Sequence, residues 1–293
     1  MGRFIEKLTP YRKVVAELPR ESIFDYKGQR IHIRDEGEGP VYLLLHGLAA
    51  SLHSFRELYD RMVPGSRLIA MDLNGFGYTE RPKKPKHYQI EHQTDLIFQL
   101  IKSLGIESAV VVGHSYGAAV GTVFAKRYPR RVRGLVLISP PHFHGEAAPW
   151  YVRNWLGGRV AFWLTRLLLS RPEKWKEVWS RAIHVEAVAT KELSEVYRKQ
   201  LLIQGLRDAF FGLAESFVTG LPESVHYDQI QHPVMILAGR EDEVIDRDRV
   251  EEVAESIGSA RLEWISDCGH CAPEERPELV IELLRAFERE VEA

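Results

Sequence analysis

Short, continuous runs of apolar residues alternate with amphipathic helical stretches along most of the 293-residue chain. The first clear run is Val41–Leu45, and similar runs recur at 68–73, 109–112, 132–138, 234–237 and 261–265. Continuous rather than alternating apolarity is typical of strands that are buried on both faces. Helical periodicity separates most of the runs, at 55–62, 93–103, 118–127, 249–257 and 279–291. The pattern predicts an α/β fold with a mostly parallel central sheet flanked by helices.

The segment between Pro141 and about His226 interrupts this alternation, because it contains no buried strand pattern and is typical of several helices. It also holds five of the six tryptophans: Trp150, Trp155, Trp163, Trp175 and Trp179. We expect residues 142–226 to form a helical cap inserted into a core made of residues 1–141 and 227–293. The aromatic side chains of the cap either pack among themselves or form an apolar wall for a substrate.

Near the N-terminus, apolar residues recur at helical spacing between positions 3 and 18. Thr9-Pro10 within this stretch is typical of a helix start. We expect a surface helix that packs on the body of the protein. The alternatives are a flap over a binding site and a helix that lies on a membrane surface. Two short strand patterns follow, at 22–26 and 30–34.

Composition excludes several classes of protein. Hydrophobic residues make up 45% of the chain and charged residues 27%, which excludes intrinsic disorder. Thirty-nine Lys and Arg against 41 Asp and Glu give a net charge of −2, so a small-molecule partner is expected rather than nucleic acid. The sequence has neither the apolar segment of a signal peptide nor an apolar run of membrane-spanning length. We therefore expect a cytoplasmic protein without integral membrane association, either a monomer or a homodimer.

The most specific motif is Gly113-His114-Ser115-Tyr116-Gly117, which lies directly between a buried strand pattern and a helix. A turn this sharp forces the serine into a strained conformation with its hydroxyl exposed, and side chains at the two glycine positions would clash with the neighbouring backbone. The N-terminus of the following helix favours an anionic intermediate. Ser115 is therefore the predicted nucleophile.

A serine hydroxyl needs a base, and the base needs a carboxylate to orient it. Among the twelve histidines, His270 lies in the loop after the last predicted strand, from which it can reach the carboxyl edge of the sheet. His114 stands beside the nucleophile and is interpreted as structural, while His46 belongs to a turn after strand 41–45. His270 is the predicted base.

Four carboxylates compete for the role of the acid in the loop after strand 233–238: Glu241, Asp242, Glu243 and Asp246. The loop after the preceding strand, 139–142, contains no carboxylate, so the acid must come from 241–246. Asp242 is predicted from its spacing to the strand end. Any of its neighbours could instead be a solvated loop charge.

An oxyanion needs two backbone N–H groups aimed at one point about 3 Å away. The turn His46-Gly47-Leu48 follows strand 41–45, and Tyr116 follows the nucleophile. The backbone amides of Leu48 and Tyr116 are the predicted pair.

Taken together, these motifs resemble the α/β-hydrolase-fold serine hydrolases, and the resemblance covers nearly the whole chain. It is carried by His46-Gly47, Asp72-Leu73-Asn74-Gly75-Phe76-Gly77, the 113–117 motif, Gly239-Arg240-Glu241-Asp242, and Gly269-His270 followed by Glu275-Arg276-Pro277. The family's order of nucleophile, acid and base matches Ser115, Asp242 and His270. By the same resemblance its oxyanion amides fall on Leu48 and Tyr116, and its cap falls on 142–226. Asn74 stands where many relatives carry Arg, which leaves the subfamily open.

The resemblance implies a carboxylesterase or lipase-like enzyme that needs no cofactor and no metal. We expect it to cleave carboxylic esters with apolar acyl or aryl groups through an acyl-enzyme intermediate. Two alternatives remain: hydrolysis of a carbon–carbon bond in a dienoic or diketone substrate by the same triad, and a non-catalytic small-molecule receptor. Epoxide hydrolases and haloalkane dehalogenases share the fold and the cap but resemble a version with Asp at the elbow, so Ser115 argues against both.

Other motifs are interpreted as incidental. His142 and His144 form an H-x-H pair without a third metal ligand beside it, so packing at the base of the cap is favoured. Cys268 and Cys271 form a C-x-x-C motif, but they lie near the C-terminus rather than after the first strand of a thioredoxin-like unit. The spacing of Gly113, Gly117 and Gly121 does not fit dinucleotide binding, because Ser115 occupies the position of the second glycine.

Overall fold

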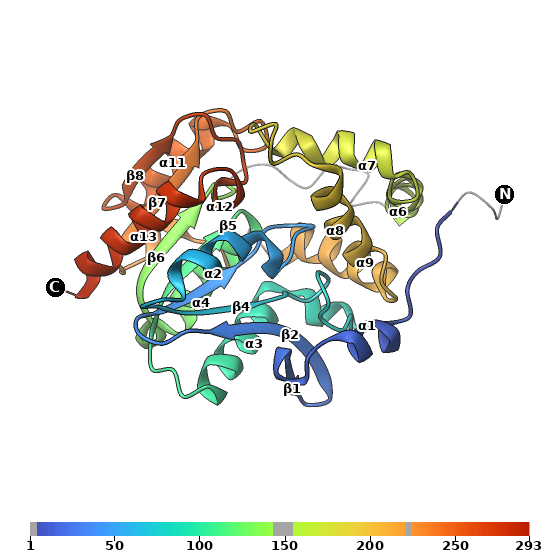
Figure 1. Cartoon of the computed structure of the whole chain (residues 1–293), viewed down its shortest axis with the longest axis horizontal. Coiled ribbons are helices and arrows are strands. Elements are labelled where there is room, and N and C mark those ends of the chain that lie inside the picture. The colour runs from blue at the N-terminus through green and yellow to red at the C-terminus, as the bar shows by residue number, and fades with distance from the viewer. Residues whose placement is uncertain (1–4, 143–154, 221–223, 293) are drawn as a thin grey trace.

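The computed structural model describes residues 5–142, 155–220 and 224–292. Its centre is an eight-stranded sheet in the order β1-β2-β4-β3-β5-β6-β7-β8 (Figure 1). The strands are β1 (Ile23–Tyr26), β2 (Gln29–Glu36), β3 (Val41–Leu45), β4 (Arg67–Met71), β5 (Ala109–His114), β6 (Val132–Ile138), β7 (Val234–Gly239) and β8 (Arg261–Ile265). The β1–β2 and β2–β4 pairs are antiparallel, and all other neighbours in the sheet are parallel. The predicted α/β fold with a mostly parallel sheet is confirmed.

Helices fill the connections between the strands. They are α1 (Tyr11–Glu17), α2 (Arg56–Met62), α3 (Ile90–Ser103), α4 (Tyr116–Arg127), α6 (Trp155–Leu169), α7 (Pro172–Trp179), α8 (Lys191–Leu201), α9 (Leu206–Glu215), α11 (Arg247–Ile257), α12 (Ala272–Glu275) and α13 (Pro277–Glu292). Single turns of 3₁₀-helix occur at Arg20–Ser22 (η1), Leu52–Phe55 (η2), Pro85–Tyr88 (η3), Pro129–Arg131 (η4), Ser180–Ala182 (η5) and Tyr227–Gln229 (η7), and Ser216–Gly220 (η6) is a short π-helix. In the described part of the chain no helix is long and apolar enough to cross a membrane.

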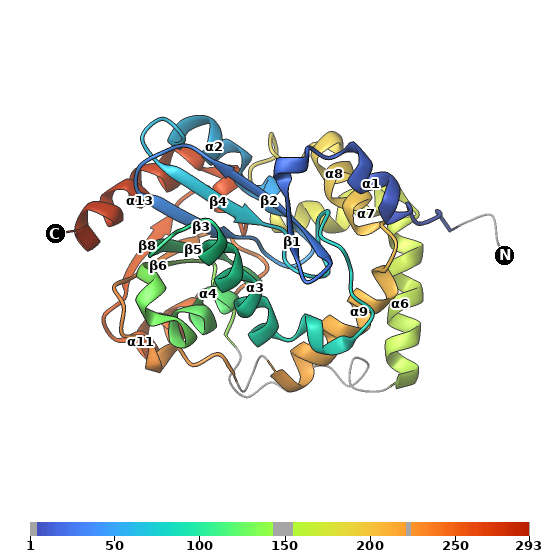
Figure 2. The ribbon, with the colours of Figure 1, turned by 90° about the horizontal axis from the view of Figure 1, so that it is seen from below.

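Strands β3 to β7 are buried on both faces of the sheet, whereas the edge strand β8 is only partly buried. Alternate side chains of a strand point to opposite faces, so each inner strand contributes to two cores. In β3, for example, Leu43 and Leu45 pack with α3 and α4 on one face, whereas Tyr42 and Leu44 pack with α2 and α13 on the other. Figure 2 shows this layering, with α2 and α13 on one side of the sheet and α3, α4 and α11 on the other. The continuous apolar runs of the sequence are explained by these two cores.

Helices α6 to α9 lie between β6 and β7 in the chain and form a separate layer at one end of the sheet (Figures 1 and 2). A buried arginine joins this layer to the core. The Arg81 guanidinium donates to the backbone carbonyls of Gln200, Leu201 and Ile203 at the C-terminal end of α8. Burial lowers the pKa of Arg81 to about 10, so the guanidinium stays charged at neutral pH. Its positive charge interacts favourably with the negative end of the α8 helix dipole.

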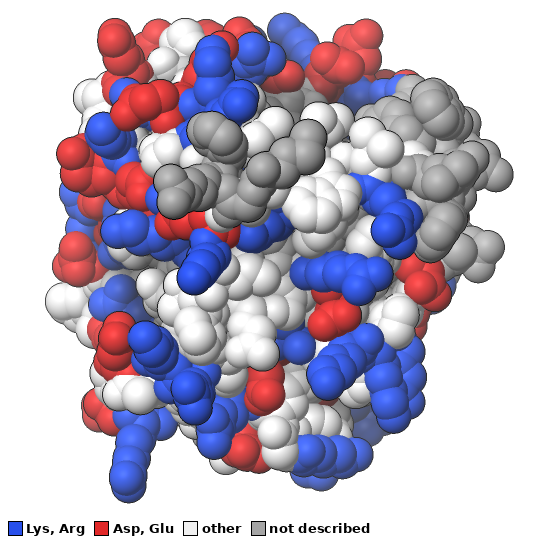
Figure 3. Space-filling view, turned by 90° about the vertical axis from the view of Figure 1, so that its right-hand side faces the viewer, with Lys and Arg blue, Asp and Glu red and all other residues white. Residues whose placement is uncertain are grey.

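The outer helix of the cap carries uncharged surface. Val160, Trp163 and Leu164 on α6 are each more than half exposed. Figure 3 shows the side of the molecule that carries α6, where uncharged surface lies between Lys and Arg side chains.

The N-terminal helix is shorter than predicted. It begins at Tyr11, one residue after the Thr9-Pro10 start that the sequence indicated, although the apolar spacing extends back to position 3; residues 1–4 lie outside the described residues. Thr9 instead forms a strand-like bridge to the cap: its N–H donates to the Leu202 carbonyl, and its carbonyl accepts from the Gln204 N–H, both at 2.8 Å. This tertiary pairing engages the backbone groups of Thr9, so Pro10 rather than Thr9 is the residue that precedes the helix.

Candidate active site

Ser115 lies at a sharp turn between β5 and α4. Its φ of 51° and ψ of −118° place a non-glycine residue in a strained region of backbone space. The turn is held from the neighbouring strand, since the Ser115 N–H donates to the Ile138 carbonyl at 2.8 Å. Strain of this kind is expected at a nucleophile elbow, where it presents the serine hydroxyl at the edge of the sheet.

The two glycines of the motif are required by close backbone approaches. A Cβ atom on Gly113 would lie 2.3 Å from the Gly117 carbonyl oxygen, and a Cβ on Gly117 would lie 2.1 Å from the Leu45 carbonyl oxygen. Neither contact can be relieved by a side-chain movement, because the opposing atoms belong to backbone. The elbow therefore forms only with glycine on both sides of His114-Ser115-Tyr116.

His270 and Asp242 form a buried pair at the ends of two neighbouring strands. The His270 Nδ1 atom lies 2.8 Å from Asp242 Oδ2, and both side chains are less than a tenth exposed. Asp242 Oδ1 accepts the backbone N–H groups of Val244 and Ile245, at 2.8 and 3.0 Å. Burial alone would raise the pKa of Asp242, but the hydrogen bond and charge of His270 and these two amides outweigh burial and hold the pKa below its usual value. An ionised Asp242 thus orients the imidazole through Nδ1.

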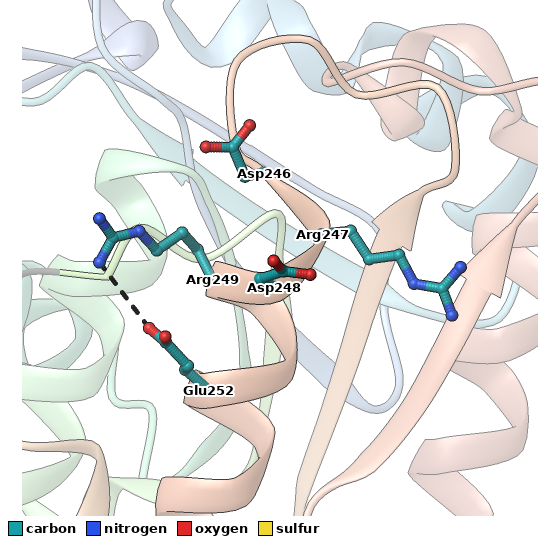
Figure 4. A pocket seen from close by; sticks show the side chains of 5 residues that line it. All are labelled: Asp246, Arg247, Asp248, Arg249 and Glu252. Atoms are coloured by element: carbon teal, nitrogen blue, oxygen red, sulfur yellow. Dashed lines mark ion pairs between the residues drawn. The ribbon is translucent and has the colours of Figure 1, made fainter.

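The competing carboxylates point to other partners. Glu241 accepts the Cys268 N–H at 3.0 Å, and Glu243 lines a hollow beside η5 of the cap. Asp246 is the residue that precedes α11, where Figure 4 shows it in a hollow lined by charged side chains. In the same hollow Arg249 forms an ion pair with Glu252.

The loop that carries Leu48 passes directly beside the serine. A Cβ atom on Gly47 would lie 3.2 Å from the Ser115 Cβ, so the backbone of this loop and the elbow are in contact. His46 holds the loop through two hydrogen bonds: its Nδ1 donates to the Gly47 carbonyl at 2.8 Å, and its Nε2 accepts the Leu73 N–H at 3.0 Å. Complete burial lowers the pKa of His46. A neutral ring with its proton on Nδ1 satisfies both hydrogen bonds, so His46 holds the backbone of Gly47 and Leu73 in place.

His114 is also structural, as the sequence indicated, but it reaches further than expected. Its Nε2 lies 2.8 Å from the His270 carbonyl oxygen, and the two rings are 4.8 Å apart. Burial and the neighbouring His270 lower the pKa of His114 to about 3. A neutral His114 therefore donates to the backbone of the loop that carries His270. The sequence placed His114 next to Ser115 but gave no sign of this contact.

Aromatic side chains of the core and the cap meet next to the elbow. Tyr116 contacts Phe76 and, from the cap, Phe217, with ring centroids 6.1 and 5.6 Å apart. Trp175 is buried within the cap and donates to the Ser194 carbonyl, while Trp163 is 56% exposed. Of the two alternatives for the cap aromatics, packing within the cap therefore holds for Trp175, whose hydrogen-bond partner belongs to the cap. Trp150 lies outside the described residues.

Cys268 and Cys271 are both free and buried. Burial raises the pKa of each thiol well above its usual value, so neither carries the thiolate that redox chemistry requires. Within the described ranges, no three His, Cys, Asp or Glu side chains come together as metal ligands. His142 contacts Glu252, and His144 lies outside the described residues.

A family model for the alpha/beta hydrolase fold matches residues 40–277. The match runs from the start of β3 to the first residue of α13, so it includes the 113–117 elbow and the loops that carry Asp242 and His270. The chain belongs to the alpha/beta hydrolase fold family.

Individual relatives cover nearly the whole chain. A 2-hydroxymuconate semialdehyde hydrolase of Pseudomonas putida is 27% identical over 281 residues, 91% of this chain and 93% of the relative. Epoxide hydrolase 3 of Xenopus tropicalis is 27% identical over 280 residues, 90% of this chain and 76% of the relative. Among solved structures, a thermophilic esterase from Thermogutta terrifontis has a TM-score of 0.76 at 22% identity and covers 93% of this chain and 98% of its own. These relatives support hydrolase activity on this fold and do not favour one class of bond.

Proposed function

We propose that this protein is a serine hydrolase that cleaves carboxylic esters with apolar acyl or aryl groups. Ser115 attacks the ester carbonyl, and His270 takes the serine proton and then gives it to the leaving alcohol. Asp242 holds the imidazole with its proton on Nδ1, and the amides of Leu48 and Tyr116 stabilise the oxyanion. Water then hydrolyses the acyl-enzyme by the same route.

The observation that carries this proposal is the strained serine between β5 and α4 together with the buried His270–Asp242 pair. Strain at Ser115 costs stability and persists only because the surrounding glycines and hydrogen bonds determine it. A carboxylate that holds a histidine by Nδ1 leaves Nε2 to act as base. Epoxide hydrolysis is disfavoured because epoxide hydrolases resemble a version of the fold with Asp at the elbow, where this chain has Ser115.

Two features support an uncharged, apolar substrate. Phe76 and Phe217 lie against Tyr116, next to the serine, and would contact an acyl or aryl group. In addition, several arginines near the cap are engaged within the protein: the buried Arg81 by backbone carbonyls, the partly exposed Arg56 by Glu274, and the buried Arg198 by Glu195 and Glu6. A substrate carboxylate would compete with these internal partners and would lose hydration on entering the site.

The second candidate is hydrolysis of a carbon–carbon bond. It is favoured by the 2-hydroxymuconate semialdehyde hydrolase that matches 91% of the chain. The same serine, histidine and aspartate would serve, but that substrate class carries a carboxylate that needs a cation in the site.

A substrate panel separates the two candidates. The kcat/KM values of p-nitrophenyl esters of graded acyl length are compared with that of one dienoic carbon–carbon substrate, with Ser115→Ala as the background. We expect ester turnover that rises with acyl length and is lost in the variant. Turnover of the carbon–carbon substrate alone would replace the ester proposal with the second candidate, and turnover of neither would favour a non-catalytic receptor. The cytoplasmic location remains a prediction from the sequence.

A further inference from the structure

A buried carboxylate holds both sides of the loop that carries His270. Glu275, at the end of α12, is only 4% exposed. Its Oε2 accepts the Gly269 N–H at 3.1 Å, and its Oε1 accepts the Cys271 N–H at 3.0 Å. These are the backbone amides immediately before and after His270, so the carboxylate fixes the backbone from which the imidazole projects.

The same carboxylate reaches the cap. Glu275 Oε2 also accepts the backbone N–H groups of His184 and Val185, at 2.8 and 2.9 Å. A direct bond runs parallel to this link, since the His270 N–H donates to the Ala182 carbonyl at 3.0 Å. The cap segment 182–185 and the histidine loop are thus joined twice, once through Glu275 and once directly.

Only a carboxylate satisfies this arrangement. Two ionised oxygens can accept four N–H bonds, whereas an amide offers one oxygen and turns two N–H donors toward the remaining backbone donors. The loop has no space to relax, because a Cβ atom on Gly269 would lie 2.8 Å from the His184 nitrogen. An amide with its oxygen in place of Oε2 would therefore leave the Cys271 N–H unsatisfied and facing a donor, and the reverse orientation would leave the N–H groups of Gly269, His184 and Val185 unsatisfied.

We propose that Glu275 is a positioning residue that clamps the His270 loop to the cap, so that the histidine is correctly placed only while segment 182–185 is seated. The clamp rests on the proposed function of His270 as the base. Glu275 acts through the backbone of residues 269–271. Release of the cap segment would move the imidazole relative to Ser115, which couples cap position to the rate of the chemical step and not only to substrate access.

The neighbouring Glu274 provides a matched control. It is also buried, also on α12 and also joined to the cap, but through side chains: it accepts from Tyr197 of α8 at 2.8 Å and pairs with Arg56 of α2. Glu274→Gln therefore changes the same atoms at the same depth and weakens a core–cap contact. Its acceptor bonds are made to these side chains rather than to the amides of the His270 loop.

The test compares Glu275→Gln with Glu274→Gln and the wild type. We expect Glu275→Gln to lower kcat for a p-nitrophenyl ester about 100-fold with KM changed less than about threefold, because a displacement of order 1 Å in a reacting group has an effect of this size. Glu274→Gln should keep kcat within about threefold. The low-field proton resonance of the His270–Asp242 hydrogen bond should shift or broaden in Glu275→Gln only, and amide exchange at 184, 185, 269 and 271 should accelerate in that variant.

Equal kcat values and equal resonances in the two variants would overturn the clamp. Should Glu275→Gln not fold, Glu275→Asp gives the same test, since its shorter carboxylate keeps the charge but cannot span both segments; wild-type kcat in that variant would overturn the clamp. A wild type without ester turnover counts against the proposed function alone. The proton resonance and the amide exchange still decide whether Glu275 joins the cap to the His270 loop.

Discussion

Replacing Asp242 by asparagine should change the tautomer of His270 rather than its position. Asp242 Oδ1 accepts two backbone N–H groups, from Val244 and Ile245, so an asparagine must keep its oxygen there. Its NH₂ group then takes the place of Oδ2, which lies 2.8 Å from His270 Nδ1. Two donors cannot face each other, so Nδ1 must become an acceptor and the ring proton must move to Nε2. A histidine protonated on Nε2 cannot take the proton of Ser115.

The size of this effect follows from the role of the lost tautomer. In serine–histidine–aspartate triads, wrong tautomer control lowers kcat by roughly 10⁴. We expect kcat of Asp242→Asn to fall by about 10³–10⁴, which corresponds to about 4–5.5 kcal/mol of transition-state stabilisation. KM should change little, because the substrate does not contact this carboxylate in the proposed mechanism.

The assay is steady-state hydrolysis of a p-nitrophenyl ester, with Glu241→Gln as the control. Glu241 is adjacent in sequence but bonds the Cys268 amide, so its variant should stay within about tenfold of wild type. Circular dichroism and thermal unfolding confirm that both variants fold. A kcat of Asp242→Asn within tenfold of wild type, or a larger loss in Glu241→Gln, would refute the tautomer argument and move the acid to another carboxylate.

Three further predictions concern the substrate wall, the glycines and acid stability. Phe217→Ala should raise KM about fivefold for a long-chain ester and less for an acetate. The variant loses the Phe217 ring beside Tyr116, and with it about 1 kcal/mol of apolar contact with the acyl chain; equal effects on both esters would contradict this. In urea unfolding, Gly113→Ala should lower the free energy of unfolding by at least about 3 kcal/mol, since its Cβ would meet a backbone oxygen at 2.3 Å. Gly158→Ala in helix α6, whose Cβ would lie 3.4 Å from its nearest neighbour, should raise the free energy of unfolding by about 0.5–1 kcal/mol. The pKa of Asp242 is lowered in the folded state, so its contribution to folding is present above the usual carboxyl pKa and is lost as the pH falls through the folded value; wild type should lose unfolding free energy more steeply than Asp242→Asn between about pH 5 and 2.

Local patterns in the sequence were sufficient to predict the sheet. The bounds predicted for the strands at 132–138 and 261–265 agree with β6 and β8. The elbow could also be predicted from the sequence, since its glycines are required by contacts within β5, α4 and the adjacent β3. Asp242 was selected among four neighbouring carboxylates by spacing alone, and in the structure it is the one that meets His270.

Features that depend on contacts between distant segments could not be predicted from the sequence. Thr9 pairs with residues 202 and 204 of the cap, so the N-terminal helix begins later than its apolar spacing indicated. Arg81 reads as an ordinary loop charge, yet it is buried against the end of α8. Glu275 was visible only as part of a family motif, because its four donors come from two segments about 90 residues apart.

The proposed mechanism requires Ser115 to be the nucleophile, and covalent labelling tests this requirement without any assumption about the substrate. A fluorophosphonate is incubated with wild type, Ser115→Ala and Asp242→Asn, and the modified residue is located by peptide mass spectrometry. We expect wild type to carry one phosphonyl group on Ser115, Ser115→Ala to carry none while remaining folded, and Asp242→Asn to be labelled far more slowly. Labelling of another serine in the wild type, or equal labelling of wild type and Ser115→Ala, would contradict the assignment of the nucleophile.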